Sequence, residues 1–206
     1  MSKINYNALV SDSNPDNRIF AAEHGVSLDI LVHDSVPEVR LAVAMQGYGW
    51  DILKDDPEPM IQDAVMYLSY VEDESFLNRI LAADNGYGLK TLICDLSEDV
   101  RAVVAEQGFG LKTLIHDKSE LVRAAVAKHG FGLGILINDE DWTVRLAVAE
   151  QGYGLDVLVH DSHWRVRAAV AEHEYGLDIL AHDENGHVRS VVKKRLAQME
   201  ANANGF

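Results

Sequence analysis

The sequence predicts an all-α protein, an α-solenoid of about nine 22-residue repeats that each hold an α-helix and a short α- or 3₁₀-helix. Three observations predict this fold. An arginine recurs every 22 residues along most of the chain, an aspartate stands six residues before it, and helix-capping residues flank the apolar segment around it. Such a period indicates that neighbouring units supply the core that no unit can form alone.

The arginine and aspartate positions set the register of the repeat. The arginine position holds Arg18, Arg40, Gln62, Arg79, Arg101, Arg123, Arg145, Arg167 and Arg189, and an aspartate precedes each by six residues. A residue that recurs in every unit cannot be a unique active site. We therefore expect a half-buried ladder of hydrogen bonds between aspartate and arginine of the same or adjacent repeats. The predicted ladder comprises Asp34, Arg40, Asp95, Arg101, Asp117, Arg123, Asp139, Arg145, Asp161, Arg167, Asp183 and Arg189.

The α-helix of each repeat is predicted to begin three residues before the arginine position. Proline or glutamate often occupies the first helical position, where a missing N–H costs little and a carboxylate meets the positive end of the helix dipole. Glycine seven residues after the arginine predicts a left-handed C-cap and a helix of about ten residues. The predicted N-cap residues are Asn14, Ser75, Ser97, Ser119, Asp141 and Asn185.

A Gly-aromatic-Gly turn and a short apolar segment follow most long helices, as at residues 152–160. Six or seven residues between helix breakers predict a short helix that needs packing to be stable. We expect residues 1–206 to form a single elongated repeat domain. Residues 1–12 would be an N-terminal half-repeat cap, 13–189 the repeats with an irregular unit at 56–78, and 190–206 a C-terminal capping helix and tail.

The irregular unit breaks the period, because Gln62 and Arg79 are only 17 residues apart and the Gly-aromatic-Gly turn is missing between them. An apolar stretch with Tyr67 and Tyr70 stands in its place. Regular patterns tend to fail at functional sites, so this unit is a candidate bend or partner anchor. Neutral drift of one unit explains the break equally well.

The phrase Val-Arg-Leu-Ala-Val-Ala, followed by a short Leu-rich segment and an aspartate, resembles the leucine-rich repeat variant family. The aspartate with Val-Arg after it is also similar to HEAT-type α-solenoids, whose units are nearly twice as long. The resemblance covers about residues 6–195 and implies a right-handed superhelix of alternating α- and 3₁₀-helices. Gln-Gly-Tyr-Gly replaces the family's Asn-Pro and Thr-Pro link, and one cysteine cannot build the iron–sulfur cluster of a founding member.

Binding specificity is expected at positions that vary between repeats. The first helical position holds Trp142 and Trp164 in two successive repeats, although proline or glutamate serves elsewhere. Tryptophan is enriched in binding hot spots, whereas packing against the neighbouring turn is the alternative explanation. The candidate binding residues are Trp142, Trp164, Arg165, Phe76, Tyr67 and Tyr70.

The sequence predicts no catalytic residue, metal or cofactor. Histidines that precede ladder aspartates recur one repeat apart, about 8–10 Å, whereas ligands of one metal ion lie about 2 Å from it. His160 and His163, three residues apart, supply only half a site. No Ser-His-Asp set and no phosphate-binding glycine loop stands apart from the repeat. We therefore expect a protein that is not an enzyme.

Composition restricts the partners. The chain has 33 acidic and 18 basic residues and a net charge of −15, which opposes direct binding to nucleic acid or an anionic membrane. One cysteine, Cys94, favours a reducing, cytoplasmic location. The favoured function is a non-enzymatic scaffold that binds another protein, with a basic partner suiting its charge. The alternatives are an acidic nucleic-acid mimic that inhibits a DNA- or RNA-binding protein and, against the shortage of free basic residues, a HEAT-like DNA-processing enzyme. The oligomeric state is open.

Overall fold

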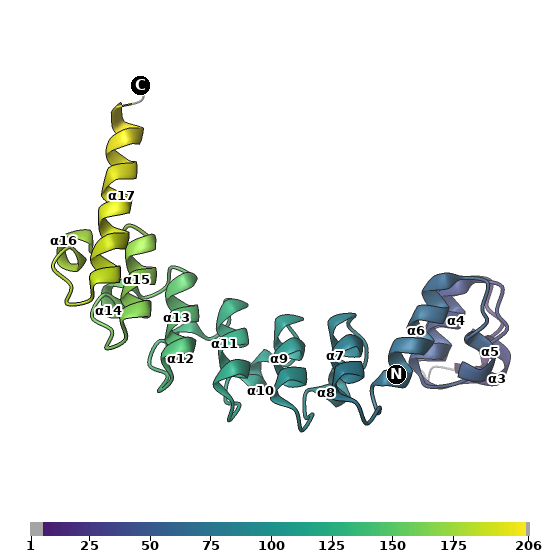
Figure 1. The fold of residues 1–206 in the computed structure, drawn as a ribbon. Coiled ribbons are helices and arrows are strands. Elements are labelled where there is room, and N and C mark those ends of the chain that lie inside the picture. Colours follow the sequence, from purple (N-terminus) through teal and green to yellow (C-terminus); the bar gives the residue numbers. More distant parts are fainter. Residues whose placement is uncertain (1–5, 205–206) are drawn as a thin grey trace, which may run out of the picture. The chain divides into compact units, whose positions relative to one another are not determined.

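The computed structural model describes residues 6–204, and every regular element in that range is an α-helix. Long and short helices alternate along the chain, which confirms the predicted all-α repeat fold (Figure 1). The chain divides into two compact units, Met1–Thr91 and Leu92–Phe206. Residues 1–5 of the predicted N-terminal cap and 205–206 of the predicted tail lie outside the described range, and the single elongated domain stays a prediction.

The long helices occupy the positions that the caps predict. Each regular one has nine residues, begins three residues before the arginine position and ends two residues before the following turn position. The N-terminal unit contains α1 Tyr6–Leu9, α2 Pro15–Glu23, α3 Leu28–Leu31, α4 Pro37–Met45, α5 Trp50–Leu53, α6 Pro59–Tyr70 and α7 Phe76–Asp84, and α8 Leu89–Leu92 lies at the division. The C-terminal unit contains α9 Glu98–Glu106, α10 Leu111–Leu114, α11 Glu120–Lys128, α12 Leu133–Leu136, α13 Trp142–Glu150, α14 Leu155–Leu158, α15 Trp164–Glu172, α16 Leu177–Leu180 and α17 Gly186–Asn204.

The core of the C-terminal unit lies between two rows of helices (Figure 1). Its long helices α9, α11, α13, α15 and α17 contact one another in sequence, and each short helix contacts the long helix before it and the one after it. The last leucine of every short helix after α1 is about 1% exposed. Small alanines on the long helices let neighbours approach closely. A four-residue helix is therefore held by packing rather than by its own propensity.

Only half of the predicted N-cap side chains make the expected hydrogen bond. Asn14, Asp141 and Asn185 accept the N–H two residues on, at 3.1, 2.7 and 2.9 Å. The serine hydroxyls make no cap hydrogen bond: Ser75, Ser97 and Ser119. At these three helices, the ladder aspartate two residues earlier accepts the N–H of the cap residue at 2.8–2.9 Å, as from Ser119 to Asp117. This Asx turn satisfies the backbone N–H of the cap residue and fixes the turn that leads into the helix.

The second glycine of each turn touches the preceding short helix. Gly154 has a φ of +62°, and a Cβ atom there would lie 2.1 Å from Cδ1 of Ile137. Only glycine combines a left-handed backbone with such a close approach. The Gly-aromatic-Gly turn therefore sets how closely successive repeats stack.

The irregular unit fuses its two helices into one. The 17-residue spacing removes five residues from the 22-residue period, and α6 runs for 12 residues. Val71 stands two residues before the aspartate Asp73, which is the position that Ile137 has before Asp139. A Cβ atom on Gly88 would lie 2.3 Å from Cγ2 of Val71. The end of α6 thus replaces the missing short helix and receives the next glycine turn.

The last helix extends further than the sequence predicts. Helix α17 takes the long-helix position of the final repeat and continues for 19 residues to Asn204, into the segment that the sequence predicts as a tail. Within residues 6–204, no helix has the length and apolar character needed to cross a membrane.

Candidate functional site

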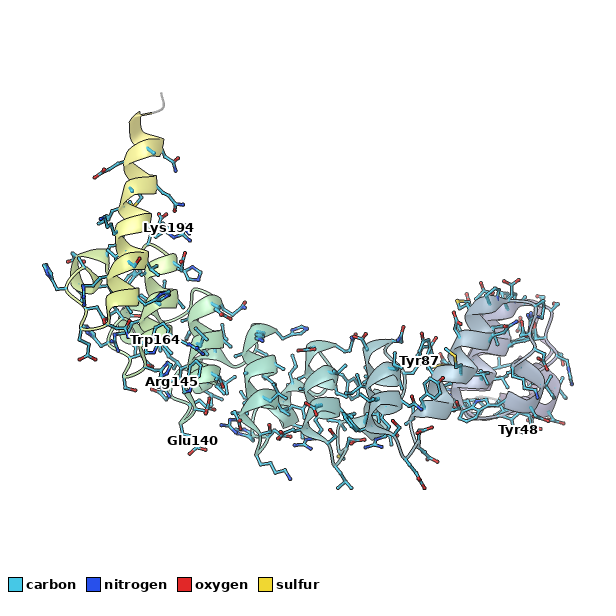
Figure 2. All side chains as sticks on the ribbon, viewed as in Figure 1. Tyr48, Tyr87, Glu140, Arg145, Trp164 and Lys194 are labelled. Atoms are coloured by element: carbon cyan, nitrogen blue, oxygen red, sulfur yellow. The ribbon has the colours of Figure 1, made fainter. Side chains whose placement is uncertain are left out.

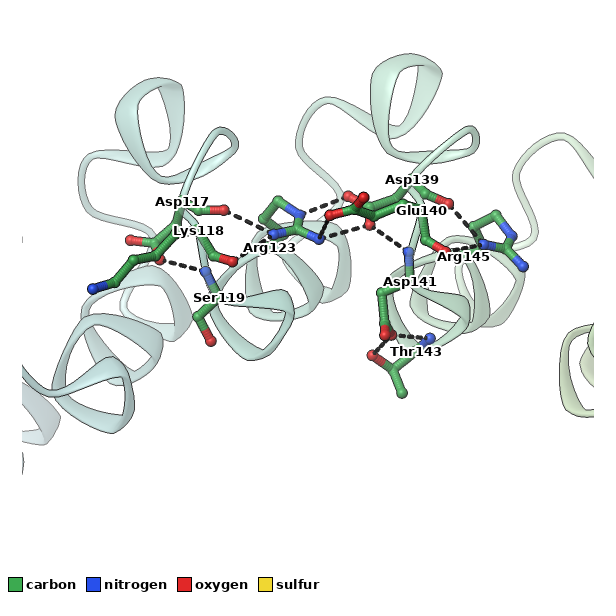
Figure 3. A network of polar contacts seen from close by, with 9 residues as sticks. All are labelled: Asp117, Lys118, Ser119, Arg123, Asp139, Glu140, Asp141, Thr143 and Arg145. Atoms are coloured by element: carbon green, nitrogen blue, oxygen red, sulfur yellow. Dashed lines mark hydrogen bonds and ion pairs between the residues drawn. The ribbon is translucent and has the colours of Figure 1, made fainter.

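The ladder arginines join consecutive repeats through a two-pronged ion pair (Figure 3). Arg123 donates from Nε to Oδ2 of Asp139 at 2.7 Å and from Nη2 to Oδ1 at 2.8 Å. Its Nη1 donates to the backbone carbonyl of Asp117 at 2.8 Å. Arg123 therefore binds the loop of its own repeat and the carboxylate of the next, a geometry that only a guanidinium fork provides.

The same carboxylate pairing recurs six times within the two units, and the side chains of these pairs are 4–14% exposed. The pairs are Arg18–Asp34, Arg40–Asp56, Arg101–Asp117, Arg123–Asp139, Arg145–Asp161 and Arg167–Asp183. Asp95 accepts the N–H of Ser97, and its carbonyl accepts Arg101. Arg189 is exposed and donates to the carbonyls of Asp183 and Glu184. Gln62 keeps only the loop contact, from Nε2 to the carbonyl of Asp56 at 2.6 Å.

The ladder carboxylates are held in the charged form. The hydrogen bond from Arg167 keeps the pKa of Asp183 below its usual value, against the opposing effect of burial. At Asp117 burial would raise the pKa, but the hydrogen bonds from Arg101 and the Ser119 N–H outweigh it and lower the pKa. The carboxylates thus carry structural charges that their partners already satisfy. Among the outer acidic residues, Glu140 projects from the loop edge (Figure 2).

Aromatic rings gather at the N-terminal ends of α13, α15 and α17. The ring of His163 stacks on Trp142 with centroids 4.0 Å apart and lies 6.0 Å from Trp164. His187 meets Trp164 edge-on at 5.2 Å. We call Trp142, His163, Trp164 and His187 the aromatic strip. Sequence reasoning considered His163 only as half of a metal site and did not single out His187. His163 directly precedes Trp164 in the sequence, and His187 follows the first residue of α17.

Arg165 lies across the aromatic strip. Its guanidinium carbon is 5.1 Å from the ring centroid of Trp142 and 5.3 Å from that of Trp164, within the range of cation–π attraction. The side chain is exposed, and no hydrogen bond or ion pair to it occurs in the described part of the chain. Two indole faces therefore hold a guanidinium whose N–H groups remain available.

Two grooves adjoin the aromatic strip within the C-terminal unit. One, of about 400 Å³, runs over α15, with Ala168 and Ala169 between Leu146 on one side and Val191 on the other. A second, of about 460 Å³, lies between α11 and α13 and includes Trp142 and Leu146. Both grooves are open, so this face suits a surface ligand better than an enclosed small molecule.

The other predicted binding residues lie in the N-terminal unit. Tyr67 stacks on Tyr87 with centroids 5.5 Å apart and meets Tyr70 edge-on at 6.3 Å. Burial raises the pKa of Tyr87, and Asp63 and Tyr67 add to the effect. Figure 2 labels Tyr87 between α6 and α7. Phe76 is 44% exposed at the first position of α7. The structure thus brings Trp142, Trp164 and Arg165 together and pairs the two tyrosines separately.

The side chains of residues 6–204 do not offer a metal or cluster site. No group of three or more His, Cys, Asp or Glu residues could hold a metal ion within the residues that the structure describes. An iron–sulfur cluster needs about four cysteine ligands, whereas this chain has the single, exposed Cys94. The residues present therefore do not fit such a group.

One solved structure is similar to this chain over most of both lengths. It is described as a leucine-rich repeat variant with a novel repetitive structural motif. The two are 26% identical, the match covers 90% of this chain and 88% of the other, and the TM-score is 0.53. No protein-family model matches the chain, and no curated protein matches it either.

Proposed function

Because the chain is a helical repeat protein similar to leucine-rich repeat variants, we propose that it is a non-enzymatic cytoplasmic scaffold that binds another protein through the face around Trp142, Trp164 and Arg165. One observation carries this proposal. Two tryptophans from successive repeats flank an exposed arginine that has no ion-pair partner among the described residues, beside two open grooves.

The composition of this face supports protein binding. Tryptophan and arginine are the residue types most enriched in interface hot spots, and small side chains beside them leave room for a partner's anchors. Nothing in the stacking of repeats requires tryptophan at the first helical position, since Glu98 and Glu120 begin the two preceding long helices. The single cysteine favours the reducing cytoplasm.

The geometry disfavours catalysis as the role of the recurring polar residues. The ladder carboxylates have lowered pKa values and bidentate arginine partners, so they are poor proton donors or acceptors at neutral pH. We therefore assign the ladder to stacking and the tryptophan face to recognition.

The test is affinity capture from a lysate of the source cell with three forms of the protein. The W142A/W164A variant should lose a partner that the native protein retains, by about 30-fold or more if both residues are hot spots. Leu96→Ala is the matched control, because Leu96 is a fully exposed apolar side chain of the same unit that lines neither groove. Equal capture by all three forms would refute the proposal.

A salt titration of the captured complex separates this proposal from the acidic-mimic alternative. A complex formed through carboxylates that imitate phosphates weakens steeply as salt rises. Apolar anchoring on tryptophan weakens little. A complex that is lost at moderate salt and survives W142A/W164A would favour the mimic.

A further inference from the structure

The groove over α15 has a basic residue at one end and acidic residues at the other, a charge arrangement that the proposed function alone does not require. Its floor is formed by Ala168 and Ala169, and its sides by Leu146 on α13 and Val191 on α17. Trp164 and Arg165 close one end, and Glu172 with Glu150 closes the other. We call this groove the α15 trough. From Trp164 to Glu172 the helix rises about 12 Å, at 1.5 Å per residue.

The basic end of the trough presents a pre-oriented donor. The guanidinium carbon of Arg165 lies 5.1 and 5.3 Å from the centroids of two indole rings, and this contact restricts the side chain while no hydrogen bond to another described residue occupies its N–H groups. A planar fork of this kind binds a carboxylate through two parallel hydrogen bonds, and little side-chain freedom remains to be lost on binding. The exposed His187 lines the same end and adds a further hydrogen-bonding ring.

The acidic end presents a carboxylate that no cation satisfies. Glu172 accepts a hydrogen bond from Nε of Arg195 at 2.8 Å, so its charge is neutralised. The carboxylate of Glu150, by contrast, has no ion pair within residues 6–204. A free base and a free acid thus bracket an apolar floor.

We propose, building on the protein-binding function above, that the α15 trough takes an extended segment of a partner protein with an acidic, an apolar and a basic side chain at alternate positions. In an extended chain alternate side chains point the same way. The first and fifth residues then lie about 13 Å apart, at 3.3 Å per residue, close to the rise of about 12 Å along α15 from Trp164 to Glu172. The partner's carboxylate meets Arg165, its apolar side chain rests on the alanines, and its cation meets Glu150.

The probe is a blocked pentapeptide, Glu-Ala-Leu-Ala-Lys, together with its reverse, Lys-Ala-Leu-Ala-Glu, because an extended chain can lie in either direction. Titration to millimolar concentration is followed by tryptophan fluorescence, to which Trp164 contributes together with Trp50 and Trp142. At least one order should bind saturably. Replacing the peptide's Glu by Gln, or its Lys by norleucine, should weaken binding about tenfold, as expected for loss of one charge-assisted hydrogen bond.

A thermodynamic cycle identifies the contact. Arg165→Gln should weaken the Glu peptide about tenfold and leave the Gln peptide unaffected, and Glu150→Gln should do the same for the Lys position. Lys112→Gln is the control, since this exposed lysine of α10 lines neither groove and its loss removes the same charge. Because the peptide substitutions leave the protein unchanged, the cycle does not depend on the stability of any variant.

Two outcomes would overturn the inference. If neither peptide order binds, while capture of a protein partner still depends on Trp142 and Trp164, the ligand class is wrong and the proposed function stands. If the native protein sediments as a dimer that Arg165→Gln dissociates, a second copy covers the trough and the peptide assignment is wrong. If the native protein binds neither peptide and W142A/W164A also leaves partner capture unchanged, the proposed function fails together with the inference.

Discussion

The ion-pair ladder leads to a prediction about stability for which the chain itself contains a control residue. Arg145 and Arg189 hold their own loops in the same way, each donating from Nη1 to two carbonyls, at 2.7 and 3.1 Å and at 2.6 and 3.0 Å. Only Arg145 also binds a carboxylate, that of Asp161, at 2.6 and 3.0 Å. Arg145→Gln and Arg189→Gln therefore differ by one bidentate ion pair.

The expected cost follows from burial. Gln62 shows that glutamine at this position keeps the loop hydrogen bond. In Arg145→Gln the carboxylate of Asp161, 5% exposed, keeps the His163 N–H but loses its cation. Removing one partner of a buried ion pair lowers the free energy of unfolding by about 3–5 kcal/mol, because the other charge stays buried without its partner. Arg145 is 14% exposed, so we expect a loss at the lower end of this range, about 3 kcal/mol. Arg189→Gln alters an exposed side chain and should stay within about 0.5 kcal/mol.

Urea unfolding followed by circular dichroism measures both free energies. For a chain of this size, about 3 kcal/mol lowers the melting temperature by about 6–12 °C. Equal unfolding free energies of the two variants, within about 1 kcal/mol, would show that the bidentate pair does not stabilise the stack. The ladder would then set only the register of the repeats.

Further predictions concern pH, the glycine turn and the short helices. The ladder aspartates have folded-state pKa values below the unfolded value of about 3.9. Their contribution to stability is therefore complete above that pH and is lost as the pH falls through the folded values. An acid titration of ellipticity at constant salt should show unfolding below about pH 4, and constant stability to pH 2 would contradict this prediction. Gly154→Ala forces a clash with Ile137 and should cost about 2–4 kcal/mol, whereas Gly130→Ala, with nothing within 4 Å, should cost only the left-handed strain of about 1 kcal/mol; equal urea midpoints would refute the close-approach argument. Leu158→Ala empties a site that is 1% exposed and should cost about 2–5 kcal/mol in the same assay, with a value below 1 kcal/mol excluding a packed core there.

Local signals accounted for most helix boundaries. Proline and glutamate at the first helical position and glycine after the last turn act within a few residues of the chain, so their effect is visible in the sequence. Helix α4 begins at Pro37 and α11 at Glu120 for this reason. The serine N-cap positions were predicted correctly, but the serine hydroxyls make no cap hydrogen bond. The sequence did not reveal that the ladder aspartate two residues earlier accepts the N–H of the cap residue itself.

The irregular unit shows where a period stops being informative. The 17-residue spacing reveals a deletion, but not how the chain absorbs it. Fusion of two helices into α6 keeps Val71 in the place where the next turn needs a β-branched side chain. That outcome depends on the contact with Gly88, which is a property of the stacked repeats.

The sequence by itself determined the repeat, its helical content and the polar columns, because period, capping and turn chemistry are local. Only the tertiary structure decided that Arg123 binds the carboxylate of Asp139 in the next repeat while its own loop supplies a carbonyl. Only the tertiary structure brought Trp142 and Arg165 together, since they lie a full repeat apart in the chain. Contacts between repeats depend on how adjacent helices stack, and the spacing of residues within one repeat does not specify which side chains then meet.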